Sequence, residues 1–178
     1  MGHKHSKDDI LDGALETAFD VGLSQLTFGS VAKRLGINDR TVVYYFATKA
    51  DLIGEVLGAL AEQLLLTLGT AFTTPATDHR EVLRIAWPIL SNPESDRVFA
   101  LFFEANGLAV SEREPFATIV RDIVDGWIAW TAEFIDGTSS YRRSEAETAV
   151  AIVDGLLLLR LLAGPAAAER AAANLGIA

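Results

Sequence analysis

Apolar residues recur at intervals of three and four along most of the chain, which is the spacing of amphipathic helices. The first of these runs covers residues 7–21, where Ile10, Ala14 and Ala18 share one face before Gly22. No segment alternates apolar and polar residues as a half-buried strand does, and no internal repeat is visible. The pattern therefore predicts an all-α fold of about nine helices.

Capping signals divide the first part of the chain into three short helices and one long helix. Thr27 precedes the segment FGSVAKRL, and Asn38 precedes DRTVVYYF. Thr48 with Asp51 three residues later forms a capping box for a fourth helix, along which leucines continue as far as Leu68. These signals predict where each of the first four helices begins.

The second part of the chain is also expected to be helical. A break at TTPAT separates it from the long fourth helix. The expected helices are 77–90, one that begins at Pro93, 112–136, 144–164, and a short one that begins at Pro165. We therefore expect a small N-terminal domain, residues 1–50, and a larger C-terminal domain, residues 51–178.

The net charge of −9 at first argues against nucleic-acid binding, because contact with phosphates requires a cationic surface. The charge is uneven, however, since residues 53–178 contain nine arginines, no lysine and 17 carboxylates. Residues 28–49 carry Asp39 as their only acid, against four cations: Lys33, Arg34, Arg40 and Lys49. The only locally basic stretch thus coincides with the second and third helices.

These two helices, joined by the glycine-containing turn GIN, match a helix-turn-helix, whose second helix enters the DNA major groove. With Val42 and Phe46 facing the core, four side chains of the second helix point outward: Arg40, Thr41, Tyr44 and Tyr45. Arginine and threonine contact base edges, and tyrosine hydroxyls donate to phosphates. Lys49 can share a phosphate with the start of the fourth helix. The motif predicts a DNA-reading surface, although short helix pairs also occur in ordinary core packing.

The chain resembles the TetR (tetracycline-repressor-like) family of bacterial transcription regulators over residues 10–53, from ILDGALETAF to LTFGSVAKRLGINDRTVVYYFATKADLI. Phe46, Lys49 and Leu52 follow the helix-turn-helix at the spacing of that family. The resemblance implies a homodimer with two N-terminal domains that bind a double-stranded DNA operator. It also implies a C-terminal domain that dimerises and holds a small-molecule effector.

Carried over by position, the resemblance implies roles for six residues. Phosphate contacts are implied for Thr27, Tyr44 and Lys49, and base contacts for Arg40, Thr41 and Tyr45. The sequence departs from the family at Val43, where a tyrosine is usual, and at Asp39, where a basic or small residue is usual; Arg40 also stands where a small residue is common. An alternative is therefore a helical small-molecule-binding or interaction protein that has lost specific DNA binding.

Aromatic residues of the second half lie at helical spacing, as the lining of an effector cavity would. The residues expected in a ligand pocket are Trp87, Phe99, Phe102, Phe103, Asn106, Ile123, Trp127 and Trp130. Such a pocket suits a small apolar or amphipathic ligand, which Glu104 is one candidate to orient. The same stripes are also typical of a helical core, and Glu104 can equally be a solvated surface group.

The segment AVAIVDGLLLLRLLAG is apolar almost all round, so the helix at about 144–163 must be covered on more than one side. We expect a homodimer through this helix and the alanine-rich helix at about 165–175, unless a monomer buries the first helix entirely. An effector that moves the fourth helix would then change the spacing of two recognition helices and release the operator, as expected of a repressor.

Other classes of function lack their motifs. The chain has no cysteine, and His79, the only histidine outside the N-terminal tail, has no catalytic or metal-binding motif around it, so no enzyme, metal or cofactor is expected. Met1-Gly2-His3 with His5 is a weak copper or nickel motif. No apolar run reaches the length of about 18 residues that spans a bilayer, which predicts a cytoplasmic protein without a membrane segment.

Overall fold

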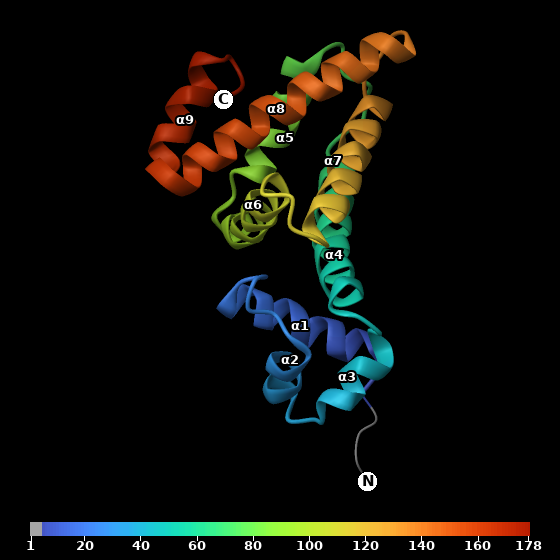
Figure 1. The fold of residues 1–178 in the computed structure, drawn as a ribbon. Coiled ribbons are helices and arrows are strands. Elements are labelled where there is room, and N and C mark those ends of the chain that lie inside the picture. Colours follow the sequence, from blue (N-terminus) through green and yellow to red (C-terminus); the bar gives the residue numbers. More distant parts are fainter. Residues whose placement is uncertain (1–4) are drawn as a thin grey trace. The chain divides into compact units, whose positions relative to one another are not determined.

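The computed structural model describes residues 5–178, and in that range the chain forms nine α-helices and one short 3-10 helix (Figure 1). The helices are α1 (Lys7–Val21), α2 (Phe28–Leu35), α3 (Asp39–Tyr45), α4 (Lys49–Gly69), α5 (His79–Leu90), α6 (Asp96–Val110), α7 (Phe116–Glu133), α8 (Ser139–Ala163) and α9 (Pro165–Asn174), and the 3-10 helix is η1 (Pro93–Ser95). The predicted all-α fold is confirmed.

The chain divides into two compact units. Unit 1 comprises Met1–Ala61 with Leu101–Ile119, and unit 2 comprises Glu62–Ala100 with Val120–Ala178. The helices α4, α6 and α7 each contribute residues to both units. The expected boundary between a DNA-binding domain, residues 1–50, and a C-terminal domain, residues 51–178, is a division by function. It stays a prediction.

In unit 1, α2 packs against both α1 and α3. Ile10, Val31, Val42 and Phe46 are fully or almost fully buried between these short helices. Gly13 of α1 permits a close approach, because a Cβ there would lie 2.7 Å from a side-chain carbon of Leu35 in α2. The first three helices are thus held by a small apolar core and one close helix crossing.

In unit 2, α8 packs against α5 and α9. Its start differs from the prediction, because the Thr138 side chain caps the helix by accepting from the Tyr141 N–H, and the expected cap Ser144 lies inside. The expected helix 112–136 is also shorter, since α7 covers Phe116–Glu133. Both errors concern helix ends, which local sequence signals define least well.

The helix α4 is long and apolar enough, by length and composition, to cross a membrane. The expectation of no membrane segment counted only uninterrupted apolar residues, whereas Glu55 and Glu62 divide a helix that is apolar on average. In the structure 33% of its most apolar window is buried inside the protein. We interpret α4 as a partly buried helix of the core, since core helices of other proteins pass the same test.

Candidate nucleic-acid interface and internal cavity

The helix-turn-helix of α2 and α3 is defined by local caps. The Thr27 side chain accepts a hydrogen bond from the Ser30 N–H at 3.1 Å, while Gly36 ends α2 in the left-handed conformation at φ 67°. The Asn38 side chain then accepts from the Arg40 N–H at 2.9 Å and starts α3. Each cap satisfies a backbone group that a helix end leaves free, so the turn between the helices is specified by residues 36–38.

The exposed side of α3 carries polar and aromatic side chains. Tyr44 is 81% exposed and Arg40 is also exposed, while Thr41 is half-buried. Val43 and Asp39, the two departures from the family pattern, share this exposed surface. The helix therefore presents an arginine and a tyrosine to solvent. The apolar Val43 and the acidic Asp39 beside them reduce the number of groups that could contact a phosphate.

Tyr45 is held differently from Tyr44. Its hydroxyl donates a hydrogen bond to the His5 carbonyl at 2.8 Å, and its ring is half-buried in edge contact with the Tyr44 ring, whose centroid lies 5.0 Å away. A base contact through this hydroxyl would require the bond to His5 to break. In this conformation Tyr45 positions the start of α1 and its neighbour Tyr44.

Thr27 and Lys49, the other two predicted DNA contacts, are exposed at the first turns of α2 and α4. The Lys49 ammonium donates to the Ser24 carbonyl at 3.4 Å, a long hydrogen bond that leaves donors available. Both positions therefore place a polar side chain at the N-terminal end of a helix, an arrangement that favours an anion such as a phosphate.

Two charged side chains hold α2 and the loop after α1 in place. Arg34 of α2 donates to the Thr17 hydroxyl at 3.0 Å and pairs with Asp20, both on α1. Glu104 of α6 accepts hydrogen bonds from the backbone N–H groups of Leu23 and Ser24, both at 2.9 Å. Glu104 is thus neither a ligand-orienting residue nor a free surface group, and sequence reasoning missed this role because no local signal links residues about 80 positions apart.

We expect Glu104→Gln to loosen the loop after α1. The amide replaces one accepting oxygen by a donor and removes the charge, so at least one of the two bonds is lost, at a cost of about 1.5 kcal/mol. Amide hydrogen exchange at Leu23 and Ser24 should then accelerate about tenfold. The matched control Glu133→Gln alters an exposed residue of α7; equal exchange in both variants would contradict the role of Glu104.

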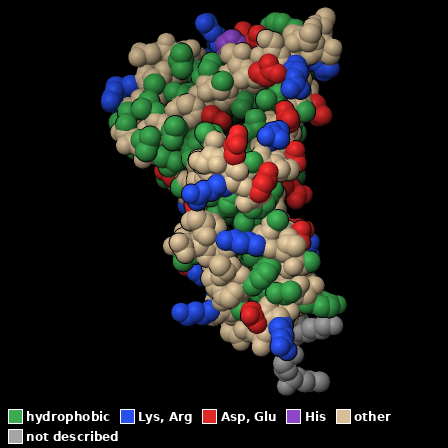
Figure 2. Space-filling view, in the orientation of Figure 1, with side chains coloured by type: hydrophobic (Ala, Val, Ile, Leu, Met, Phe, Trp, Pro, Cys, Tyr) green, Lys and Arg blue, Asp and Glu red, His purple; other side chains and the backbone are tan. Residues whose placement is uncertain are grey.

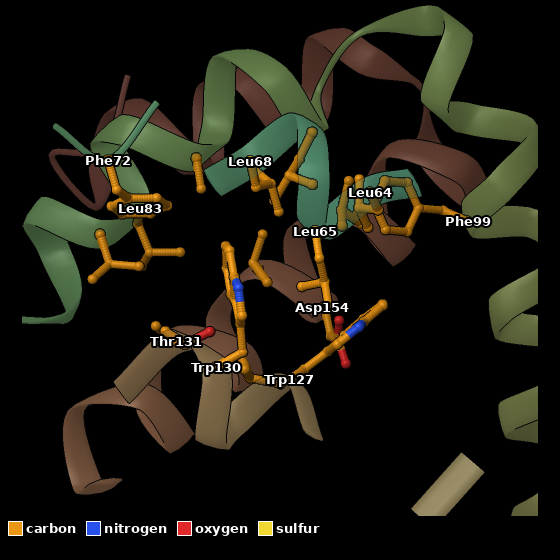
Figure 3. Close-up of a pocket in the computed structure, with 17 residues that line it drawn as sticks. Leu64, Leu65, Leu68, Phe72, Leu83, Phe99, Trp127, Trp130, Thr131 and Asp154 are labelled. Carbon is orange, nitrogen blue, oxygen red and sulfur yellow. The ribbon is translucent and has the colours of Figure 1, made fainter. Parts of the chain in front are cut away.

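Unit 2 contains a partly open cavity of about 60 Å³. It is lined by aliphatic residues of α4, α5 and α8, by Phe72 after α4, and by aromatic residues of α6 and α7 (Figure 3). The Trp130 indole points from α7 into the cavity, and Thr131 and Asp154 bring the polar side chains to it. This is an apolar, aromatic site with very few polar groups, as small-molecule sites commonly are.

The structure places three of the predicted pocket residues, Phe99, Trp127 and Trp130, in the lining of this cavity. The other five do not line it: Trp87, Phe102, Phe103, Asn106 and Ile123. The Trp87 indole N–H instead donates to a carboxylate oxygen of Glu169 in α9 at 3.3 Å.

The other predicted pocket residues have different surroundings. Phe102 and Phe103 belong to unit 1, with ring centroids 5.7 Å apart, and Asn106 also lies there. Ile123 is half-buried in α7. A stripe of aromatic residues along α6 thus divides between two cores, because α6 contributes to both units.

Asp154 is the one residue with a formal charge in the cavity lining. Its Oδ1 is buried and has no hydrogen-bond partner within residues 5–178, and burial raises the pKa of the carboxyl from 3.8 to about 6. The carboxylate is therefore mostly ionised at neutral pH although it is poorly solvated. Sequence reasoning did not single out this residue, yet an aspartate in an otherwise apolar helical segment was a visible signal.

Within the described residues no group of three or more His, Asp or Glu side chains is placed to hold a metal ion. The Met1-Gly2-His3 motif lies outside the residues that the structure describes.

Two short capped helices, the second with an exposed arginine and tyrosine, define a helix-turn-helix DNA-binding protein. Residues 10–56 match the family model for bacterial regulatory proteins of the tetR family. Residues 10–56 therefore form a DNA-binding domain of the tetR family of bacterial regulatory proteins. Members of this family are non-enzymatic DNA-binding regulators.

Solved structures agree on the fold over almost the whole chain. A transcriptional regulator from Rhodococcus sp. Rha1 is 23% identical, with a TM-score of 0.73 over 94% of this chain and 91% of that one. A TetR transcriptional regulator from Legionella pneumophila is 20% identical, with a TM-score of 0.62 over 92% and 91%. The multidrug binding protein EbrR, complexed with proflavin, is 25% identical, with a TM-score of 0.64 over 96% and 97%. No curated protein matches the chain.

Proposed function

We propose that this protein is a cytoplasmic, ligand-responsive repressor that binds a palindromic operator as a homodimer and is released by a small-molecule effector. The observation that supports it most is the presence, in one chain, of an exposed recognition helix in unit 1 and an apolar cavity in unit 2. The similarity to EbrR, which is described as a multidrug binding protein and was solved with proflavin, supports an effector role for the cavity.

Dimerisation is supported by the outer surface of α8 and α9. Leu162 is 78% exposed and Leu158 40%, although both lie in an apolar helix, and Leu175 after α9 is 46% exposed. Figure 2 shows hydrophobic side chains gathered on the part of the surface formed by these two helices. A second copy of the same surface would cover them, which is the usual arrangement of a twofold dimer.

Release by an effector would use the helices that the two units share. A ligand in the cavity contacts α4, α6 and α7, each of which continues into unit 1. In a dimer, successive major-groove contacts lie about 34 Å apart, so a small displacement of these helices is enough to weaken operator binding. Effector and operator would then select different states of one equilibrium.

The first test is selection of DNA fragments by the purified protein at two salt concentrations. We expect enrichment of a palindromic site, with an affinity that falls steeply as salt rises, because Lys and Arg displace counterions from phosphates. Without such enrichment, the alternative of a helical ligand-binding protein that has lost specific DNA binding would be favoured, with Val43 and Asp39 as the reason.

Variants of α3 test the recognition surface on the selected site. Arg40→Ala is expected to weaken binding by about 1–3 kcal/mol and to relax the preference at one base pair. Tyr44→Phe removes a hydroxyl donor to phosphate, so it should weaken all sequences about equally. Arg121→Ala, which removes an exposed arginine of α7, is the control for lost positive charge. Equal affinity of all three variants in a binding titration would show that α3 does not read DNA.

A further inference from the structure

The cavity of unit 2 contains a charge that the protein itself does not neutralise. Its lining includes no Lys, Arg or His, so the Asp154 carboxylate faces apolar and aromatic side chains. A buried carboxylate normally pairs with a cation or accepts several hydrogen bonds, because taking its charge out of water is costly. Asp154 Oδ1 has neither in the described part of the chain.

The aromatic side chains of the lining have the complementary property. Trp127 and Trp130 lie on α7, Phe99 lies on α6, and the Phe72 ring meets the Trp130 ring edge-on with centroids 6.0 Å apart. The faces of such rings carry partial negative charge and attract organic cations, most strongly when water is excluded. The Asp154 carboxylate and the aromatic rings thus both favour a positively charged ligand.

We propose that the effector is a planar aromatic organic cation, held by Asp154 as its counter-ion and by Trp127 and Trp130 as stacking surfaces. The proposal rests on the proposed function, because it assigns a chemical class to the effector of that same cavity. An anionic ligand would be repelled by Asp154, and an uncharged ligand would leave the carboxylate without a partner.

The size of the cavity adds a condition. A volume of about 60 Å³ is smaller than the 300–1,000 Å³ of typical ligand sites, so a fused-ring cation must displace lining side chains. Phe72, which follows α4, and the leucines at the end of α4 are the lining residues nearest in sequence to the part of α4 that belongs to unit 1. We therefore expect entry of the cation to displace the end of this helix.

The test compares two probes that differ in charge and hardly in shape. N-methylacridinium is a permanent cation, whereas acridine has the same three fused rings and is uncharged at about pH 8. Binding to the full-length protein is measured by titration calorimetry and by quenching of tryptophan fluorescence. We expect the Kd of the cation to be at least about tenfold lower than that of acridine.

The variant Asp154→Asn keeps the shape of the side chain and removes its charge. The preference for the cation should fall to about twofold or less in this variant and stay unchanged in Asp122→Asn, which removes an exposed carboxylate of α7 that does not line the cavity. The proposal is overturned if the native protein binds both probes equally or does not bind the cation, or if Asp154→Asn keeps the preference.

Release of the selected operator fragment separates this proposal from the proposed function. If an uncharged compound releases the DNA and N-methylacridinium does not, the assigned effector class is wrong and the ligand-responsive regulator stands. If the cation binds in an Asp154-dependent way and the DNA stays bound, the ligand class of the cavity stands, but its role as effector and the coupling of cavity to operator fail.

Discussion

Replacing Asp96 with alanine is expected to destabilise the protein by about 3 kcal/mol. Asp96 begins α6, and its two carboxylate oxygens accept from the Arg160 guanidinium of α8 at 2.6 and 3.2 Å. The side chain of Arg160 is only 5% exposed, against 36% for Asp96. Removal of the carboxylate therefore leaves a buried positive charge without its counter-ion, which costs far more than the loss of an exposed pair.

A double-mutant cycle makes this expectation specific. Arg160→Met in the Asp96→Ala background removes the stranded charge and fills its space with an apolar side chain, so most of the lost free energy of unfolding should return. The exposed pair of Arg143 with Glu147 provides the control, and Glu147→Ala should cost less than about 1 kcal/mol. Urea unfolding measures all of these variants; equal losses for Asp96→Ala and Glu147→Ala would contradict the argument.

The second large effect has the opposite sign: Asp154→Asn is expected to stabilise the protein at about pH 7.5 by about 1–3 kcal/mol. Burial raises the pKa of this carboxyl from 3.8 to about 6, and the difference corresponds to at most about 3 kcal/mol. A raised pKa means that the folded state disfavours the ionised form. The penalty is absent below about pH 4, grows between about pH 4 and 6, and is complete above about pH 6.

Urea unfolding of native protein and variant near pH 4 and near pH 7.5 tests the sign. The variant should be the more stable at the higher pH and about equally stable at the lower one. Asp122→Asn should change little at either pH, because that carboxylate is exposed. A gain of the same size at both pH values would mean that packing, and not ionisation, explains the difference. If the Asp154→Asn variant is more stable than the native protein, its expected loss of cation binding is not due to misfolding.

The N-terminal part of the fold could be predicted from sequence because its signals are local. Thr27, Asn38 and Thr48 each cap the helix that they were expected to cap, and Gly36 ends α2 in the left-handed conformation. These hydrogen bonds join residues two or three positions apart, so the sequence around each cap is sufficient to specify it.

The start of α8 could not be predicted in the same way. Ser144 and Glu147 have the spacing of a capping box, but Glu147 instead forms an ion pair with Arg143 on the same helix at 2.9 Å. Thr138 caps the helix instead, so α8 begins closer to the N-terminus of the chain than expected. A spacing of three residues is therefore shared by caps and by pairs in helix interiors, and only the structure distinguishes them.

The cavity lining depends on contacts between distant segments, so helical periodicity predicted it only in part. Phe99, Trp127 and Trp130 line the cavity, whereas Phe102 faces the core of the other unit from the same helix as Phe99. Most of the lining is aliphatic and looks like any helical core in sequence. The hydrogen bonds of Glu104 could not be predicted from the sequence either, because their partners lie in a loop that is remote along the chain.

Unit 1 is discontinuous in the chain, which has a consequence for synthesis of the protein. A ribosome that has released α1 to α4 has not yet made Glu104 or the buried residues Leu101 and Phe102. The unit that carries the recognition helix is complete only when about two thirds of the polypeptide has emerged, since Leu101–Ile119 belongs to it. Chains interrupted before residue 119 consequently lack part of the unit that carries the recognition helix.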